Sequence, residues 1–223
     1  MPVDVQAEPR SRNLQDVLDG LGGVAPSRIL ADPPPGTATE RDAIRVNERK
    51  AALCELVDGV LVEKGMGYAQ SVLAVFLARL LDEYAEARGL GAVSGADGYL
   101  RLLPGLLRAP AVAFTRWERL PEGTPPNLAP VPDVAPDLVV EVLSDSNTER
   151  EMARKREEYF KAGVLVVWEV DPRRRTVAIH RSGAAPRTLA SGDVLDTGDV
   201  LPGFQVAVDR LFGKLDGPGN RPR

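Results

Sequence analysis

A glutamate inside an apolar segment is the first residue of this sequence that could do chemistry. Glu141 stands in the run from Leu138 to Leu143, which is nearly unbroken, rich in β-branched residues and typical of a strand covered on both faces. A carboxylate there would be desolvated at a cost of several kcal/mol unless a cation or a proton offsets it. The position of Glu141 therefore predicts a charged partner.

Lys155 is well placed to be that partner. In a helix of 100° per residue, Lys155 lies about 40° from Tyr159 and about 60° from Met152, so it borders the face turned toward the sheet. A lysine aimed inward could offset Glu141, or the two could jointly serve a metal and its water. Burial would lower the pKa of Lys155 and suit it to proton transfer, whereas pairing with Glu141 would raise that pKa.

A strand, a helix and a second strand would position these two residues. Thr148 to Glu151 fits the capping box, in which the Thr hydroxyl and the Glu carboxylate each bond a free backbone N–H at a helix start. Gly163 can adopt the left-handed conformation needed just past the helix end. Val164 to Val170 is typical of a second buried strand. Two strands joined by a crossover helix form a parallel, almost always right-handed pair, which predicts an α/β fold.

The motifs around this unit resemble a known family. PDLVVEVLS from Pro136, followed by K..EY..AGV..VWEVDP from Lys155, is similar to the putative restriction endonuclease (Uma-type) family of the PD-(D/E)XK nuclease superfamily, which is common in bacteria. The resemblance runs from about Leu53 to Phe212 and includes CELVDGVLVEK and VLPGF. It implies a restriction-endonuclease-like mixed central sheet flanked by helices.

The resemblance also implies an activity, which is the Mg²⁺- or Mn²⁺-dependent hydrolysis of phosphodiester bonds in DNA. Glu141 would hold the metal, Lys155 would orient or deprotonate the water, and Glu55 would support the pocket. Because the metal lowers the pKa of bound water and offsets charge on the phosphate, acids and one lysine suffice. Related nucleases often pair to cut two strands, so the resemblance further implies a homodimer.

Glu55 itself lies in a predicted hairpin. Leu53 to Glu63 contains two short strands around Asp58-Gly59, a dipeptide suited to a type I′ turn because both residues tolerate positive φ. From the residues alone, a solvent-facing hairpin carboxylate is an equally good interpretation of Glu55.

Two positions depart from the family pattern. The family expects a Pro-Asp pair in the second of the strands predicted between Val93 and Phe114, and the sequence has Pro110 followed by Ala111. Alanine cannot ligate a metal, and the missing carboxylate is normally a main Mg²⁺ ligand. The change predicts impaired catalysis or, alternatively, a catalytically silent nucleic-acid-binding or regulatory module that keeps the fold. The superfamily's usual lysine position, two residues after the glutamate, holds Leu143, and Lys155 is the matching lysine.

Asp137 is a second candidate metal ligand because it also follows a proline. It precedes Glu141 by four residues, and at about 3.3 Å per residue the two side chains would be roughly 13 Å apart along a straight strand. Both cannot hold one ion unless the chain bends between them. The alternative is a strand-start residue that bonds to nearby backbone.

Length and composition are those of one folded domain. The 223 residues, 43% of them hydrophobic, suffice for one substantial core. We expect a flexible leader over 1–45, a nuclease-like domain over 46–213 and a polar tail over 214–223. No apolar run reaches the roughly 20 residues of a membrane span, no signal pattern is present, and the single Cys54 cannot form an internal disulfide. These features predict a soluble cytoplasmic protein.

Basic residues cluster locally although the net charge is −4. One cluster lies on the predicted helix and comprises Arg150, Arg154, Arg156 and Lys161. The other is the triplet Arg173 to Arg175 in a predicted turn, and either could contact DNA phosphates. The triplet is the better candidate, because the helix residues alternate with glutamates and fit a solvated face. His180, the single histidine, is expected at the surface, and no zinc site is predicted.

Overall fold

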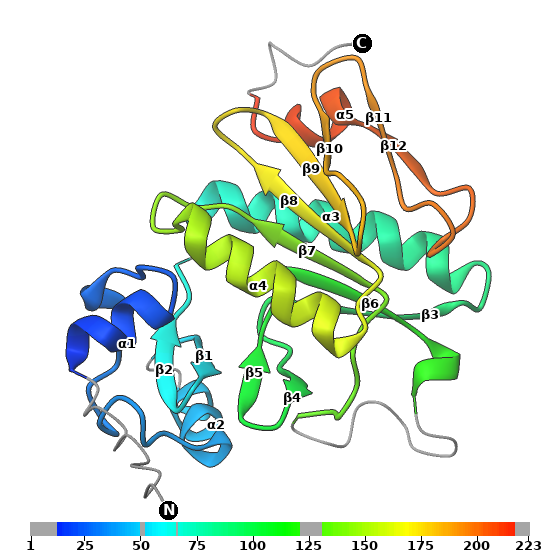
Figure 1. The fold of residues 1–223 in the computed structure, drawn as a ribbon. Coiled ribbons are helices and arrows are strands. Elements are labelled where there is room, and N and C mark those ends of the chain that lie inside the picture. Colours follow the sequence, from blue (N-terminus) through cyan, green and yellow to red (C-terminus); the bar gives the residue numbers. More distant parts are fainter. Residues whose placement is uncertain (1–12, 50–51, 66, 121–130, 217–223) are drawn as a thin grey trace, which may run out of the picture.

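A mixed sheet lies at the centre of the computed structural model, which describes residues 13–49, 52–65, 67–120 and 131–216. Its strand order is β10-β9-β8-β7-β6-β3 (Figure 1). Within it, β7 and β8 are parallel and the other neighbours are antiparallel. The strands are β3 (Gly91–Gly95), β6 (Val112–Arg116), β7 (Leu138–Val142), β8 (Val166–Asp171), β9 (Thr176–Arg181) and β10 (Arg187–Leu189). The predicted α/β fold with a mixed central sheet flanked by helices is confirmed.

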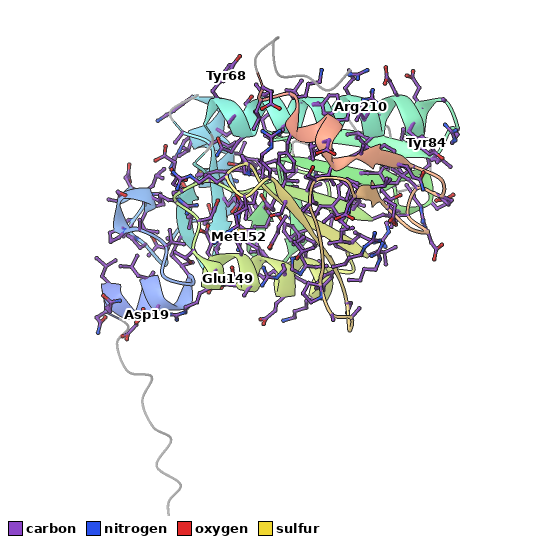
Figure 2. The ribbon with its side chains drawn as sticks, turned by 90° about the horizontal axis from the view of Figure 1, so that it is seen from above. Asp19, Tyr68, Tyr84, Glu149, Met152 and Arg210 are labelled. Atoms are coloured by element: carbon purple, nitrogen blue, oxygen red, sulfur yellow. The ribbon has the colours of Figure 1, made fainter. Side chains whose placement is uncertain are left out.

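Helices cover both faces of this sheet. Figure 2 shows α3 (Tyr68–Glu86) on one side and α4 (Glu149–Ala162) on the other. The larger apolar cluster, which includes Trp168, lies on the α3 side, and a second cluster that includes Tyr159 lies on the α4 side. Because β7 and β8 are buried on both faces, their valine-rich runs do not alternate with polar residues.

The connection between β7 and β8 follows the sequence-based expectation with one exception. Thr148 caps α4 by accepting a hydrogen bond of 3.0 Å from the Glu151 backbone N–H, and Gly163 ends the helix with φ of 98°. The predicted capping box is only half formed, because the Glu151 carboxylate bonds Arg28 at 2.9 Å through both of its oxygens. A distant arginine therefore outcompetes the local backbone N–H for this carboxylate.

A smaller antiparallel sheet of order β2-β1-β5-β4 lies beside α4 (Figure 1). Its strands are β1 (Cys54–Val57), β2 (Val60–Glu63), β4 (Leu100–Leu103) and β5 (Leu106–Arg108). The predicted hairpin between β1 and β2 is confirmed, with positive φ at both Asp58 (50°) and Gly59 (73°). This sheet directs Glu55 toward the first turns of α4.

The N-terminal region packs against these elements. It forms α1 (Leu14–Gly20), η1 (Pro26–Arg28) and α2 (Glu40–Glu48). The Thr148 hydroxyl donates a hydrogen bond of 2.6 Å to the Gly22 carbonyl, and a Cβ at Gly22 would come within 2.6 Å of the Glu151 backbone N. Residues 13–45 thus differ from the expected flexible leader, because they bond to the β1–β2 hairpin and, through Gly22 and Arg28, to α4. Residues 1–12 lie outside the described residues.

The C-terminal region lies on the α3 side, where β11 (Val194–Asp196) pairs with β12 (Gln205–Ala207) and α5 (Val208–Phe212) contacts α3 (Figure 1). Residues 217–223 of the predicted tail lie outside the described residues. In the described ranges, none of the helices is long and apolar enough to cross a membrane.

Candidate active site

Three predicted site residues meet between the small sheet, the central sheet and α4. Glu55 comes from β1, Glu141 from β7 and Lys155 from the second turn of α4, and they are 1%, 4% and 2% exposed. Lys155 Nζ lies 3.0 Å from Glu55 Oε2 and 3.4 Å from Glu141 Oε1. The predicted cationic partner of Glu141 is therefore present, and Glu55 is not a solvent-facing hairpin residue.

Two residues that the sequence analysis did not single out fix the two carboxylates. The Tyr159 hydroxyl, one helical turn after Lys155, donates a hydrogen bond of 2.7 Å to Glu141 Oε1. Arg108, the last residue of β5, donates a hydrogen bond of 2.6 Å to Glu55 Oε2 and one of 2.9 Å to Glu158. The Ala109 backbone N–H adds a contact of 3.3 Å to Glu55 Oε1. Both carboxylates are thus oriented by groups from several elements.

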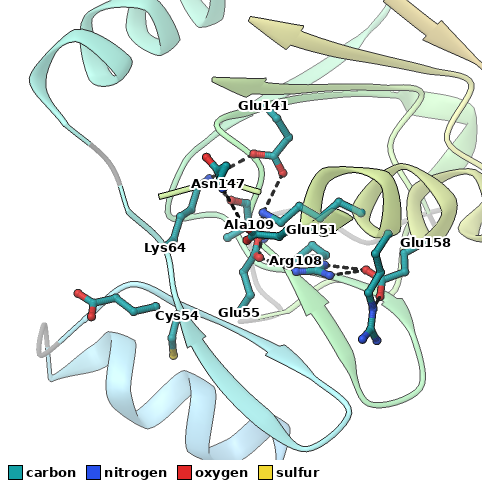
Figure 3. Close-up of polar contacts among 12 residues, drawn as sticks. Cys54, Glu55, Lys64, Arg108, Ala109, Glu141, Asn147, Glu151 and Glu158 are labelled. Atoms are coloured by element: carbon teal, nitrogen blue, oxygen red, sulfur yellow. Dashed lines mark hydrogen bonds and ion pairs between the residues drawn. The ribbon is translucent and has the colours of Figure 1, made fainter. Parts of the chain in front are cut away.

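Lys64, just past the end of β2, brings a second ammonium group to the site. Its Nζ donates a hydrogen bond to the Ala109 carbonyl and lies 4.0 Å from Glu141 Oε2, and its side chain is 8% exposed (Figure 3). Lys64 belongs to the motif CELVDGVLVEK, which is the signal that could have drawn attention to it. We call the following residues the carboxylate–lysine site: Glu55, Glu141, Lys64, Arg108, Lys155 and Tyr159.

Burial and charge act in opposite directions on Glu55 and Lys155. Burial alone would raise the pKa of Glu55, but Lys155, Arg108 and Lys64 together hold the pKa of this carboxyl well below its usual value. Burial alone would lower the pKa of Lys155, but Glu141 and Glu55 raise it above its usual value. The effect of pairing with Glu141 therefore outweighs the effect of burial on the pKa of Lys155, and this side chain remains a protonated ammonium at neutral pH.

The other ionisable groups of the site respond differently. Burial lowers the pKa of Lys64, and Glu141 and Glu55 offset only part of this effect. Burial and the nearby Glu141 and Glu55 carboxylates raise the pKa of Tyr159 well above its usual value, so its hydroxyl stays a neutral donor. The pKa of Arg108 is also raised, because Glu55 and Glu158 outweigh the effect of burial.

The donor set of the site fits a divalent cation that keeps most of its water. Glu141, Glu55 and the Ala109 carbonyl are oxygen donors of the kind Mg²⁺ takes, and Mg²⁺ commonly uses only one or two protein carboxylates. A third acid is missing. Ala111 is buried directly before β6, where Val112 pairs with Val140, and it belongs to the larger apolar cluster. Among the described residues, no group of three or more His, Cys, Asp or Glu side chains could hold a metal.

Asp137 is not brought to the carboxylate–lysine site. It immediately precedes β7 and is buried, where it accepts hydrogen bonds of 2.9 Å from the Arg119 Nε and from the Arg116 backbone N–H. This matches the alternative of a strand-start residue that bonds to nearby backbone. The structure thus separates Asp137 from Glu141, as the extended strand between them requires.

His180 differs from the surface residue that we expected. Its side chain is mostly buried, and its Nε2 lies 3.2 Å from Glu169 Oε2. Glu169, which is paired with Glu141 across β7 and β8, also accepts a hydrogen bond of 2.7 Å from Arg156. The local reason is that β9 follows β8 directly and pairs His180 with Val167, two residues before Glu169 on the same face of β8.

Ion pairs occupy most of the basic residues of α4. Arg154 pairs with Asp58 and Glu158, and Arg156 pairs with Glu169. In the turn after β8, Arg173 pairs with Asp145 and Arg174 with Asp171, but both arginines are exposed and line an open pocket at the carboxyl ends of β7 and β8. The side chains of Arg173 and Arg174 are thus more exposed to solvent than those of Arg154 and Arg156.

Comparison with protein families matches residues 42–209 to Uma2, described as putative restriction endonuclease. This chain belongs to that family. Among solved structures, it is similar to a putative nuclease of DUF820 from Anabaena variabilis, with a TM-score of 0.66 and 16% identity over 73% of this chain and 91% of that one. Comparison with curated proteins gives no match. The predicted family and fold are confirmed.

Proposed function

We propose that this protein hydrolyses phosphodiester bonds of DNA at the carboxylate–lysine site with the help of Mg²⁺ or Mn²⁺. The observation that carries the proposal is the meeting of two buried carboxylates, Glu55 and Glu141, at the Lys155 ammonium within 3.4 Å. Buried charges are costly and are retained chiefly where a function uses them. Membership of the Uma2 family supports a nuclease reaction.

The residues of the site would divide the work. Glu141, oriented by Tyr159, would hold the metal, and Glu55, held by Arg108, would keep Lys155 in place. Because its pKa is raised, Lys155 would act as a fixed positive charge toward the phosphate and the attacking water rather than as a base. A bound divalent metal supplies a water of lowered pKa and offsets charge on the phosphate.

We infer that catalysis is impaired because Ala111 removes a carboxylate beside Glu141. Because the neighbouring Val112 pairs with Val140, an aspartate in place of Ala111 would lie near the end of β7 that carries Glu141, where the two acids could share a cation. Without it, the metal has fewer charged ligands and binds more weakly. The same observation favours a second candidate function, a catalytically silent nuclease fold that binds nucleic acid.

DNA would approach from the side of Arg173 and Arg174, whose exposed guanidinium groups can contact phosphates. Cutting both strands would need two sites, so we expect a homodimer, acting in the cytoplasm. Sedimentation velocity of the purified chain, with and without a DNA duplex, tests this expectation. A monomer under both conditions would contradict it.

Plasmid cleavage separates the two candidate functions. The protein, Ala111→Asp and Glu141→Gln are each incubated with supercoiled DNA and either Mg²⁺ or Mn²⁺. Slow cleavage by the native chain that is lost in Glu141→Gln and accelerated in Ala111→Asp supports the nuclease. Cleavage by Ala111→Asp alone supports the silent module.

If none of the three proteins cuts DNA and calorimetry detects binding of neither metal nor DNA, both candidate functions are wrong. Thermal melting of Ala111→Asp must accompany the assay. The Ala111 methyl group belongs to the buried residues of the apolar core, and an aspartate there could unfold the protein.

A further inference from the structure

The two oxygens of Glu141 have different partners. Oε1 accepts the hydrogen bond from the Tyr159 hydroxyl and contacts Lys155 Nζ at 3.4 Å. Oε2 accepts no hydrogen bond from the described residues, and its charged neighbour is Lys64 Nζ at 4.0 Å (Figure 3). Oε1 is thus held in place by Tyr159 and Lys155, whereas the charged group near Oε2 is the Lys64 ammonium.

The Lys64 ammonium lies between two oxygen donors. It donates to the Ala109 carbonyl on one side and faces Glu141 Oε2 on the other. A carboxylate oxygen and a backbone carbonyl are ligand types that Mg²⁺ and Mn²⁺ prefer. The ammonium therefore occupies a position that suits a divalent cation.

Charge balance decides whether both cations can be present together. Around the site, the carboxylates of Glu55, Glu141, Glu158 and Asp58 face an equal number of cationic side chains, namely Lys64, Arg108, Lys155 and Arg154. A divalent ion added to this buried group would leave two uncompensated positive charges, which is costly in a low dielectric. Departure of one lysine would halve that excess.

Lys64 is the lysine that can leave. It follows the last residue of β2, its side chain is 8% exposed where that of Lys155 is 2% exposed, and it makes one hydrogen bond in the site. Lys155 instead projects from within α4 and contacts both carboxylates. A long lysine side chain at the end of a strand can rotate its ammonium into water without moving the backbone.

We propose that Lys64 is an internal counter-ion that occupies the metal position beside Glu141, swings out when a divalent cation binds, and so lowers the metal affinity of the site. This proposal rests on the metal-dependent function proposed above. It adds that a residue of this chain, besides Ala111, limits metal occupancy.

Titration calorimetry with Mn²⁺ tests the proposal on the native chain and on Lys64→Met. We expect the variant to bind Mn²⁺ about tenfold more tightly, equivalent to about 1.4 kcal/mol. Lys161→Met is the matched control, because it removes the same charge from an exposed position of α4 and should leave affinity unchanged. In Lys64→Met/Glu141→Gln the gain should vanish. Equal affinities, or no binding by any of these proteins, would overturn the proposal.

Chemical labelling of the native chain provides a second measurement that needs no variant. Reductive methylation followed by mass spectrometry reports the accessibility of each lysine. On addition of Mn²⁺, Lys64 should become more reactive while Lys155 stays protected. Lys64 reactivity that falls or stays constant at saturating Mn²⁺ would contradict displacement. If Lys64→Met binds Mn²⁺ more tightly but the native chain does not cleave DNA, the proposed function is wrong and the role of Lys64 stands. If the native chain cleaves DNA but Lys64→Met binds Mn²⁺ with unchanged affinity, the proposed function stands and the role of Lys64 is wrong.

Discussion

Two buried carboxylates at opposite ends of β7 are neutralised in different ways. Asp137 precedes the strand and bonds to the Arg119 side chain and the Arg116 backbone N–H, both at 2.9 Å. Glu141, near the other end, bonds to Tyr159 at 2.7 Å but faces its lysines at 3.4 and 4.0 Å. Both acids are almost inaccessible to solvent. The difference therefore lies in the partners and not in the depth of burial.

The origin of the partners explains this contrast. Those of Asp137 come from the neighbouring β6 and the short η2 helix (Trp117–Arg119), and they bond both carboxylate oxygens. Those of Glu141 come from α4 and from the end of β2, and they leave Oε2 without a hydrogen bond from the described residues. A satisfied carboxylate stabilises a strand, whereas a partly satisfied one can exchange partners with an incoming cation.

Acid should produce the largest change in stability. The pKa values of Glu55, Glu151 and Glu169 are lowered in the folded protein by their cationic partners, which outweigh burial. Their stabilising contributions are complete above the unfolded pKa of about 4.3 and are lost as pH falls toward the folded pKa values. We expect the free energy of unfolding from urea titrations to drop steeply between about pH 5 and pH 2.

Glu55→Gln sharpens this prediction. The variant lacks the carboxylate whose charge is most fully buried, so its stability should depend less steeply on pH over the same range. Glu83→Gln, which changes an exposed glutamate of α3, serves as the control and should keep the native slope. Parallel slopes for the native chain and Glu55→Gln would show that folding does not lower the pKa of Glu55.

Removal of Lys155 should be the most damaging single substitution in the carboxylate–lysine site. Lys155→Met keeps a chain of similar length but leaves Glu55 and Glu141 with one fewer cation. Breaking a buried ion pair typically lowers the free energy of unfolding by about 3–5 kcal/mol. Urea titration at pH 7 measures the loss. A value below about 1 kcal/mol would mean that Lys155 contributes no more than a surface charge.

Asp137→Asn should cost less and leave the chemistry intact. One carboxylate oxygen becomes an amide group that can no longer accept from Arg119 or the Arg116 N–H, and the expected loss is about 1–3 kcal/mol. Because Asp137 does not touch the carboxylate–lysine site, Mn²⁺ affinity and plasmid cleavage should match the native chain. Loss of metal binding in a folded Asp137→Asn protein would restore its predicted role as a ligand.

The local part of the site could be predicted from the sequence. The β-branched run around Glu141, the Thr148 cap and Gly163 fix a strand and a helix by short-range chemistry, and helical spacing then directs Lys155 toward the sheet. That reasoning placed Glu141 and Lys155 together correctly. It worked because both residues belong to one strand–helix unit whose geometry is nearly invariant.

The remaining partners could not be predicted because they come from elements far away in the chain. Arg108 and Lys64 approach from the small sheet, and no periodicity in the sequence says which face of α4 that sheet covers. Arg28 illustrates the same limit, since its bond to Glu151 spans 123 residues and turns an expected leader into a packed segment. His180 was expected at the surface because no cysteine or acidic cluster stands at ligand spacing beside it, and its partner, Glu169, is brought to it only by the pairing of β8 with β9.

The smallest effect is expected for an exposed ion pair of ideal geometry. Arg79 and Glu83 lie one turn apart on α3 with an N to O distance of 2.8 Å, which is shorter than either lysine contact of Glu141. Arg79→Met should nevertheless lower the free energy of unfolding by less than about 0.5 kcal/mol, because water screens the pair and solvates the Glu83 carboxylate that is left. Urea titration beside Lys155→Met gives the comparison directly. If the exposed pair proved as costly to break as the buried one, distance rather than desolvation would govern both, and the contrast between Glu141 and Asp137 would lose its physical basis.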